Sequence, residues 1–265
     1  MIKILGIPYD EHSSYQRGAA GAPPLIREAL YCPSANLWTE LGDDLGGEGV
    51  LEDCGDIQLE DSSQAFEQIE TAMLKHIRTE SPVISLGGDH AITYPLIKAV
   101  SRQYKALSIL HFDSHPDLYD SFEGDRLSHA CPFARIMENG LVQRLVQVGI
   151  HTMNAHCRQQ AARFGVEVVE MINFQEDWLP KFDTPVYISF DMDGLDPAFA
   201  PGVSHREPGG LTIRQVLRII HKLNAPLIAA DIVEFNPRRD QDGLTAMVSA
   251  RILKEIAGKM IAQRK

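Results

Sequence analysis

Three short segments of the chain place histidine and aspartate side chains directly after apolar runs. The first segment ends in GGDH, the second in DSHPD and the third in DMDGLDP. Because residues two apart in an extended segment point the same way, the polar side chains within a segment can converge on one side. A metal-chelating edge requires this alternation, and its candidate ligands are His90, Asp113, His115, Asp117, Asp191 and Asp193.

The ligand types indicate which metal would bind. For any one segment alone, a structural role, such as a helix-capping aspartate or a packed histidine, is about as good an explanation as a metal ligand. Three together favour a metal site, because crowded carboxylates repel one another unless cations neutralise them. Imidazole and carboxylate ligands without thiolate disfavour structural zinc and suit manganese, with iron, cobalt or nickel as substitutes. The number of ligands implies two ions.

The charge of such a cluster predicts the class of its substrate. The four ligand carboxylates carry four negative charges, which two divalent ions would cancel. Two nearby dications lower the pKa of a bridging water enough to give hydroxide at neutral pH. The hydroxide leaves the cluster anionic, so that a cationic guanidinium would restore neutrality.

The elements that must position these residues alternate along the chain. Short apolar runs rich in β-branched residues predict strands buried on both faces. These runs are 2–7, 83–86, 107–112, 145–150, 166–170, 186–190 and 227–233, with a weaker run near Val50. Segments of helical period lie between them, at 24–30, 64–78, 94–104, 132–137, 155–164, 212–223 and 243–257. The alternation predicts an α/β fold with a parallel sheet, in which sites form beyond the carboxyl ends of the strands.

Composition narrows the class of protein. With 265 residues and 44% hydrophobic content, the chain is expected to form one domain over residues 1–265. A net charge of −11 disfavours nucleic acid and anionic membrane partners and favours a small cationic one. The four cysteines form no C-x-x-C pair, which argues against a zinc knuckle. Without a long apolar run or a signal-peptide pattern, we expect a cytoplasmic location.

The motifs GGDH, HFDSHPD and SFDMDGLDP, in this order, resemble the ureohydrolase family of arginases, agmatinases and formiminoglutamases. The likeness runs from RGAAGAPPLIREAL to DIVEFNPRRDQDGLTAMVSARI, which is nearly the whole chain. It implies a three-layer α/β/α sandwich around an eight-stranded parallel sheet. It also implies a binuclear manganese hydrolase, two Mn²⁺ per subunit and a homo-oligomer, either a trimer or a hexamer.

The resemblance assigns the ligands residue by residue. One ion would be held by His90, Asp113, Asp117 and Asp191. The other would be held by His115, Asp113, Asp191 and Asp193. Ser114 stands where the family usually has alanine, but it is not a ligand position.

The resemblance also implies the residues that handle the substrate. Glu234 matches the glutamate of a D-x-x-E motif that meets the guanidinium, and a carboxylate can accept two parallel N–H bonds. His129, in LSHACPF, matches a histidine that passes a proton to the departing amine. Asn154 and the loop 119–128 are candidates for binding the far end of the substrate. His129 and Glu234 are thus the expected catalytic pair.

Several functions stay open at this level. The loops look closest to the agmatinase-like arginases of plants and bacteria, which ranks L-arginine first and agmatine second. Other guanidino or formimino compounds remain alternatives. A single-zinc deacetylase shares the architecture but does not explain GGDH together with both Asp191 and Asp193. A non-catalytic binding module of the same fold would be natural only if ligands were missing.

Overall fold

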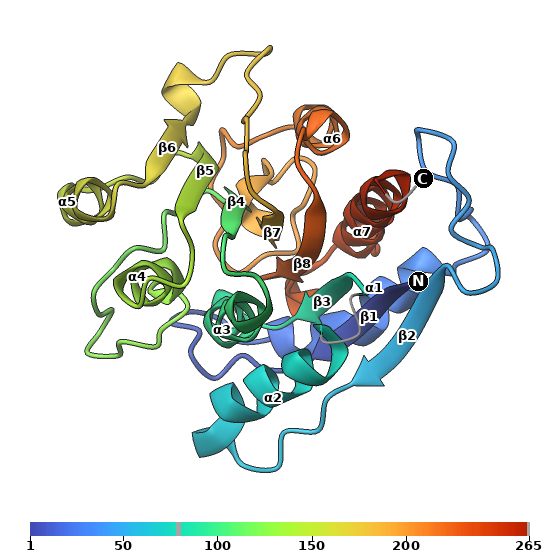
Figure 1. Cartoon of the computed structure of the whole chain (residues 1–265), viewed down its shortest axis with the longest axis horizontal. Helices are drawn as coiled ribbons and strands as arrows, with labels where there is room; N and C mark the ends of the chain where they lie inside the picture. Colours follow the sequence, from blue (N-terminus) through green and yellow to red (C-terminus); the bar gives the residue numbers. More distant parts are fainter. Residues whose placement is uncertain (78–80, 264–265) are drawn as a thin grey trace.

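The fold is described from a computed structural model that covers residues 1–77 and 81–263. Its centre is a single sheet of eight parallel strands in the order β2-β1-β3-β8-β7-β4-β5-β6 (Figure 1). The strands are β1 (Ile2–Ile7), β2 (Leu51–Asp56), β3 (Val83–Gly87), β4 (Ser108–Phe112), β5 (Arg144–Ile150), β6 (Glu167–Glu170), β7 (Val186–Asp191) and β8 (Leu227–Val233). The predicted parallel sheet is confirmed.

Helices cover both faces of the sheet. The α-helices are α1 (Ala22–Leu30), α2 (Ala65–Ile77), α3 (Thr93–Gln103), α4 (Pro132–Glu138), α5 (Ala155–Phe164), α6 (Ile213–Lys222) and α7 (Leu244–Ala262). Short 3-10 helices are η1 (Ala19–Gly21), η2 (Ser62–Gln64), η3 (His90–Ile92), η4 (Met171–Asn173), η5 (Met192–Gly194) and η6 (Pro237–Arg239). Each predicted helix is present. The predicted end of the second at Arg78 falls outside the described residues.

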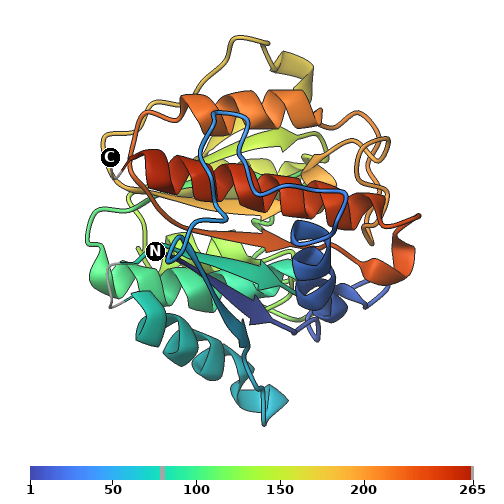
Figure 2. The same cartoon turned by 90° about the vertical axis from the view of Figure 1, so that its right-hand side faces the viewer.

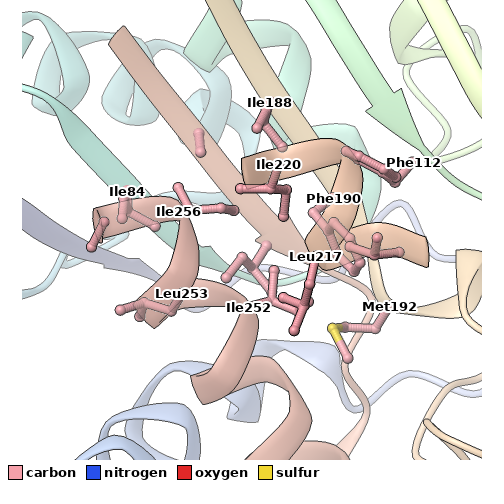
Figure 3. Packing of buried hydrophobic residues seen from close by; sticks show 14 of the residues in the cluster. Ile84, Phe112, Ile188, Phe190, Met192, Leu217, Ile220, Ile252, Leu253 and Ile256 are labelled. Atoms are coloured by element: carbon pink, nitrogen blue, oxygen red, sulfur yellow. The ribbon is translucent and has the colours of Figure 1, made fainter. Parts of the chain in front are cut away.

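The two helical layers bury separate halves of the core. Helices α1, α6 and α7 lie on one face, and α2 to α5 lie on the other (Figures 1 and 2). On the first face, Ile188 and Phe190 of β7 pack with Leu217 of α6 and Ile252 of α7 (Figure 3). Helices pack on both faces of a parallel sheet because each strand must return through a crossover. The expected three-layer α/β/α sandwich is confirmed.

The two edge strands depart from the sequence prediction. All apolar runs were predicted to be buried on both faces, but β2 and β6 consist of partly buried and exposed residues. Each of them has only one neighbouring strand in the sheet. Charged residues such as Glu52, Asp53, Glu167 and Glu170 occupy these edges, where they discourage pairing with another sheet. The prediction of burial on both faces is therefore wrong for the edges.

Strand order explains how distant motifs meet. Strands β3, β8, β7 and β4 are consecutive neighbours in the centre of the sheet, although they are far apart in sequence. GGDH begins at the last residue of β3, and DSHPD follows β4. DMD begins at the last residue of β7, and Glu234 directly follows β8. The carboxyl ends of parallel strands share one edge, so these four segments converge there. Among residues 1–77 and 81–263, no helix has the length and apolar character needed to cross a bilayer.

Candidate metal centre

The register of the central strands brings the acidic residues to one level. Phe112 pairs with Phe190 across β4 and β7, so Asp113 and Asp191 leave their strands side by side. Between β3 and β8, Leu86 pairs with Ile232, and Glu234 then donates its backbone N–H to the Gly88 carbonyl at 2.9 Å. The sheet itself therefore sets the spacing of the cluster.

The first group of candidate ligands surrounds His90. Its Nδ1 atom lies 2.9 Å from Asp117 Oδ2, 3.1 Å from Asp191 Oδ2 and 3.2 Å from Asp113 Oδ2. The His90 and Asp113 side chains are fully buried, and Asp117 and Asp191 are nearly so. These four residues are the set that the family resemblance assigns to one ion.

The second group forms around His115, on the loop after β4. Its Nδ1 atom lies 3.3 Å from Asp193 Oδ2 and 3.4 Å from Asp113 Oδ1. Asp113 thus turns one oxygen toward each imidazole, which is the arrangement of a bridging carboxylate. Asp191 joins this group through Asp193, whose backbone N–H donates to Asp191 Oδ1 at 2.8 Å. The structure brings all six predicted ligands together, and their role as ligands stays a prediction.

Hydrogen bonds fix which nitrogen of His90 faces the carboxylates. The Ser189 hydroxyl donates to Asp231 Oδ1 at 2.8 Å, so Ser189 Oγ must accept from His90 Nε2, 3.0 Å away. A neutral His90 therefore carries its proton on Nε2, and its Nδ1 atom carries a lone pair. That buried Nδ1 has no hydrogen-bond partner among the described residues, yet it points at three carboxylate oxygens. A metal ion bound among these atoms would relieve the repulsion, so the residues fit a metal ion.

The protonation equilibria show the same need for positive charge. Burial opposes the charged form of His90, but the neighbouring Asp113 and Asp117 carboxylates raise its pKa well above the usual range. Burial likewise opposes charge on His115, and Asp193 beside it raises its pKa well above the usual range. Burial, and then the negative charge of Asp193, raises the pKa of Asp191. Protons or metal ions can supply the missing charge.

Backbone strain marks two of the site residues. Asp117 has φ 47° and Glu234 has φ 62°, a left-handed conformation that costs an L-residue roughly 1 kcal/mol or more. Such conformations persist when the surrounding structure enforces them, and they concentrate at functional sites. In both residues the backbone turns sharply where the side chain enters the cluster.

A glycine in η5 allows the close approach of two site segments. A Cβ atom on Gly194 would lie 2.7 Å from the Asp113 backbone nitrogen and 2.8 Å from its Cα. We therefore expect Gly194→Ala to displace Asp113 and to weaken metal binding by about 10-fold or more. Isothermal titration with Mn²⁺ measures this, with Gly21→Ala as the control, since φ there is −82° and a Cβ would meet only Pro237 Cγ at 3.8 Å. Equal affinity in Gly194→Ala and wild type would contradict the expectation.

Glu234 and His129 adjoin the cluster at a cavity. Glu234 Oε1 accepts from the His90 backbone N–H and lies 2.9 Å from His129 Nδ1. Both side chains line the cavity together with His115, Asp117, Asp191 and Asp193. Burial opposes the charged form of His129, but Glu234 raises its pKa to about 9. The catalytic pair named from the sequence is thus a hydrogen-bonded pair beside the predicted ligands.

Asn154 lies behind Tyr119, which separates it from the cavity. Its Oδ1 accepts from the Cys157 backbone N–H at 2.9 Å and so caps α5. Its Nδ2 donates to the Tyr119 hydroxyl, and Tyr119 lines the cavity. Asn154 itself is not one of the residues that line the cavity. The structure therefore connects it to the site through Tyr119.

Several residues that sequence reasoning passed over also contact the cluster. His111 Nε2 lies 2.8 Å from Asp113 Oδ2, so that by distance alone His111, His90 and Asp113 could share a metal ion. Gln147 Nε2 donates to the Pro116 carbonyl and lies 3.0 Å from His111 Nδ1, so that Nδ1 accepts and Nε2 carries the proton. His111 therefore donates to Asp113 and is not a ligand. His111 is fully buried in β4, directly before Phe112 and Asp113, and the sequence motifs assigned it no role.

Three further residues of the site were also missed from the sequence. The Ser114 hydroxyl donates to Asp193 Oδ1 at 2.8 Å and lies 2.9 Å from His115 Nδ1, so a position set aside as uninvolved contacts two predicted ligands. His205 and Glu207 line the cavity from the loop after η5. The sequence there, SHREPGG, carries no helical or strand periodicity that would have marked these residues.

Comparisons with known proteins give consistent results. A family model described as "Arginase family" matches residues 1–258. The chain is 47% identical to "Arginase 1, mitochondrial" of Arabidopsis thaliana, over 97% of this chain and 80% of the relative. It is 32% identical to "Agmatinase, mitochondrial" of Gallus gallus, over 96% and 79%. The solved "Arginase from Medicago truncatula" superposes with a TM-score of 0.92 at 43% identity, covering 98% of this chain and 87% of that one.

The names of these relatives correct the expected location. Plant arginases similar to this chain are named mitochondrial, or chloroplastic and mitochondrial. They point away from the cytoplasm, so the cytoplasmic expectation is wrong. It rested on tests for a secretory signal peptide and for a membrane span. Import into organelles uses a different kind of segment, amphipathic and rich in arginine and serine, which neither test detects.

Proposed function

The chain belongs to the arginase family, and from this premise we propose that it hydrolyses the guanidino group of L-arginine to urea and L-ornithine. The observation that carries the proposal is 47% identity to a plant arginase over 97% of the chain. Identity to the chicken agmatinase is 32% over a similar length. The buried cluster of two imidazoles and four carboxylates supports a metal-dependent hydrolase.

We propose that the cluster holds two Mn²⁺ ions. His90, Asp113, Asp117 and Asp191 would hold one, and His115, Asp113, Asp191 and Asp193 the other. The absence of thiolate from this ligand set, with the lone pair of His90 Nδ1 aimed at three carboxylates, supports hard or borderline divalent metals. When bound, such ions supply Lewis acidity and a water of lowered pKa.

Glu234 is proposed to bind the guanidinium. Its pKa is lowered, because the opposing effect of burial is overcome by His129 and by the His90 backbone N–H, so it is ionised at neutral pH. Among the described residues, its side-chain hydrogen bonds both fall on Oε1. Oε2 is therefore the atom proposed to accept from the guanidinium. That charge-assisted bond would hold the planar group beside the cluster.

His129 is proposed to protonate the departing amine. Glu234 fixes the orientation of its ring through Nδ1, which leaves Nε2 as the nitrogen that exchanges a proton. An imidazole next to a buried carboxylate remains protonated at neutral pH, and its pKa here is about 9. The ring is therefore loaded with a proton before the amine leaves.

We expect His129→Ala to lower kcat on L-arginine by about 10²-fold or more, because a positioned proton donor is lost. Bound metal should be unchanged, since no predicted ligand is altered. Steady-state urea release and metal analysis of the same preparation measure the two quantities. An unchanged kcat would remove His129 from the mechanism.

Tyr119 is proposed to contact the far end of the substrate. It lines the cavity, and Asn154 holds its hydroxyl in place. A phenol hydroxyl held in this way can bond to the α-carboxylate or α-amino group of L-arginine. Asn154 then contributes to substrate binding by orienting Tyr119.

The decisive experiment measures urea release by the manganese-loaded protein from L-arginine and from agmatine at equal concentrations. We expect faster release from L-arginine and two metal ions per chain. Urea from agmatine alone would contradict the ranking of substrates. One zinc per chain without urea from either compound would favour the deacetylase chemistry considered from the sequence.

We also propose a homo-oligomer, a trimer or a hexamer. Five large apolar side chains are exposed on α1, on the loop after it and at the start of α7: Leu25, Tyr31, Trp38, Leu41 and Leu244. Exposed apolar side chains of this size favour association. Light scattering measures the mass in solution, and a monomer at micromolar concentration would contradict the proposal.

A further inference from the structure

The imidazole of His129 has a second partner on the side opposite Glu234. The Ser14 hydroxyl oxygen lies 2.8 Å from His129 Nε2, while Glu234 Oε1 lies 2.9 Å from Nδ1. A carboxylate, an imidazole and a hydroxyl therefore form one hydrogen-bonded chain at the site. Ser14 also lines the cavity, and it is exposed.

The loop that carries Ser14 is fixed on both sides of it. Before Ser14, the His12 backbone N–H donates to Asp89 Oδ2 at 3.0 Å, and the His12 carbonyl accepts from the His129 backbone N–H at 3.1 Å. After Ser14, the Gly18 backbone N–H donates to Asp10 Oδ2 at 2.7 Å. The contact between Ser14 and His129 therefore belongs to a structured loop.

The chemistry of the two partners of His129 differs. Ionised Glu234 can only accept, so Nδ1 carries a hydrogen whether the ring is neutral or charged. Nε2 is then the nitrogen that gains and loses the proton. A hydroxyl can donate to a bare Nε2 and can accept from a protonated one. Ser14 can therefore bond to His129 both before the Nε2 proton passes to the amine and after it, which a purely acidic or basic side chain could not do.

We propose that Ser14 is a positioning residue for His129, holding Nε2 in line and linking it to solvent at the mouth of the cavity. This inference rests on the proposed role of His129 as the proton donor. Ser14 would thereby let the ring regain its proton between turnovers. The hydroxyl need not contact the substrate for this role.

Three variants separate this role from others. Ser14→Ala removes the hydroxyl, and Ser14→Thr retains one on the same loop. Ser13→Ala is the matched control, because the Ser13 hydroxyl donates to Asp89 and belongs to the neighbouring residue. The manganese-loaded proteins are assayed for kcat and KM on L-arginine.

We expect Ser14→Ala to lower kcat by ~10-fold with KM nearly unchanged, because removing a supporting partner weakens a catalytic group by this order. Ser14→Thr should recover most of the lost kcat, and Ser13→Ala should stay within about twofold of wild type. An unchanged kcat in Ser14→Ala would overturn the proposal. A raised KM with an unchanged kcat would also overturn it, since Ser14 would then be a substrate contact.

A second measurement does not depend on activity. In metal-free, histidine-labelled protein, the ¹⁵N resonances of the His129 ring report the hydrogen bonding of each nitrogen. We expect Ser14→Ala to shift the Nε2 resonance and to speed solvent exchange of its hydrogen, with Nδ1 little changed. If the wild type releases no urea, the proposed function fails, but this spectrum still tests the bond. An Nε2 resonance identical in Ser14→Ala and wild type would overturn it.

Discussion

Replacing His115 with alanine is expected to lower urea release by on the order of 10⁴-fold, because one of two metal ions and several kcal/mol of transition-state stabilisation are lost. His115 supplies the only imidazole of the second ligand group, with Nδ1 3.3 Å from Asp193 Oδ2. Asp113 and Asp193 would remain as ligands, and two carboxylates hold a divalent ion much less tightly than a set completed by imidazole. The metal content should therefore fall from two ions per chain to one, which metal analysis measures.

The fold should survive this substitution. His115 lies on the loop after β4, and about a quarter of its side chain is exposed (26%), so its loss opens no cavity in the core. The matched control is His76→Ala on α2, a helix that does not line the cavity. Circular dichroism should be the same for both variants, and only His115→Ala should lose metal. Full turnover by His115→Ala with one ion bound would sink the two-metal mechanism.

The fold could be predicted from the sequence because its elements are strongly patterned. The runs 2–7 and 227–233 coincide with β1 and β8, since strands buried in the middle of a parallel sheet are apolar throughout. The edge strands were predicted less well. In β2 half of the residues of LEDCGD are charged, because this edge strand has only one neighbouring strand in the sheet. An apolar pattern marks a strand only where the strand is buried, so it predicts the strands at the edges of a sheet less well.

The order of the strands in the sheet could not be predicted from the pattern of apolar residues. Nothing in the sequence places β8 between β3 and β7, because that position depends on how the crossovers pack. The convergence of GGDH, DSHPD and DMD was predicted from their positions at the ends of parallel strands, and the family resemblance agreed with it. The structure adds the register, in which Phe112 and Phe190 are paired, so that Asp113 and Asp191 emerge at one level.

Site residues could be predicted where they belong to a sequence motif. They could not be predicted where only a contact in the folded structure connects them to the site. His129 and Glu234 came from short motifs, and they lie 2.9 Å apart at the cavity. Ser14 and His111 contact the same machinery, but a lone serine in a loop and a histidine in a strand have ordinary structural explanations. Their partners are 115 and 2 residues away in sequence, so spacing gives no common rule.

Glu234→Gln is expected to lower kcat/KM on L-arginine by roughly 10³-fold, since breaking a buried charge pair costs about 2 to 5 kcal/mol. The two donors on Oε1, the His90 backbone N–H and His129 Nδ1, would hold the amide oxygen of glutamine in the same place. The amide NH₂ would then occupy the position of Oε2 and present hydrogens to a guanidinium that can only donate. Loss of the negative charge adds to this mismatch. The substitution keeps the shape of the side chain and reverses its hydrogen-bonding sense.

The metal content separates this variant from His115→Ala. Glu234 is not a predicted ligand, so Glu234→Gln should retain two ions per chain while turnover collapses. The pKa of His129 should fall from about 9, because Glu234 is the carboxylate that raises it, and NMR titration of the metal-free protein measures this change. Glu234→Asp is the matched comparison, since it keeps the charge but withdraws it, and it should retain more activity than Glu234→Gln. A kcat/KM of Glu234→Gln within twofold of wild type would leave Glu234 with the structural task of holding His90 and His129.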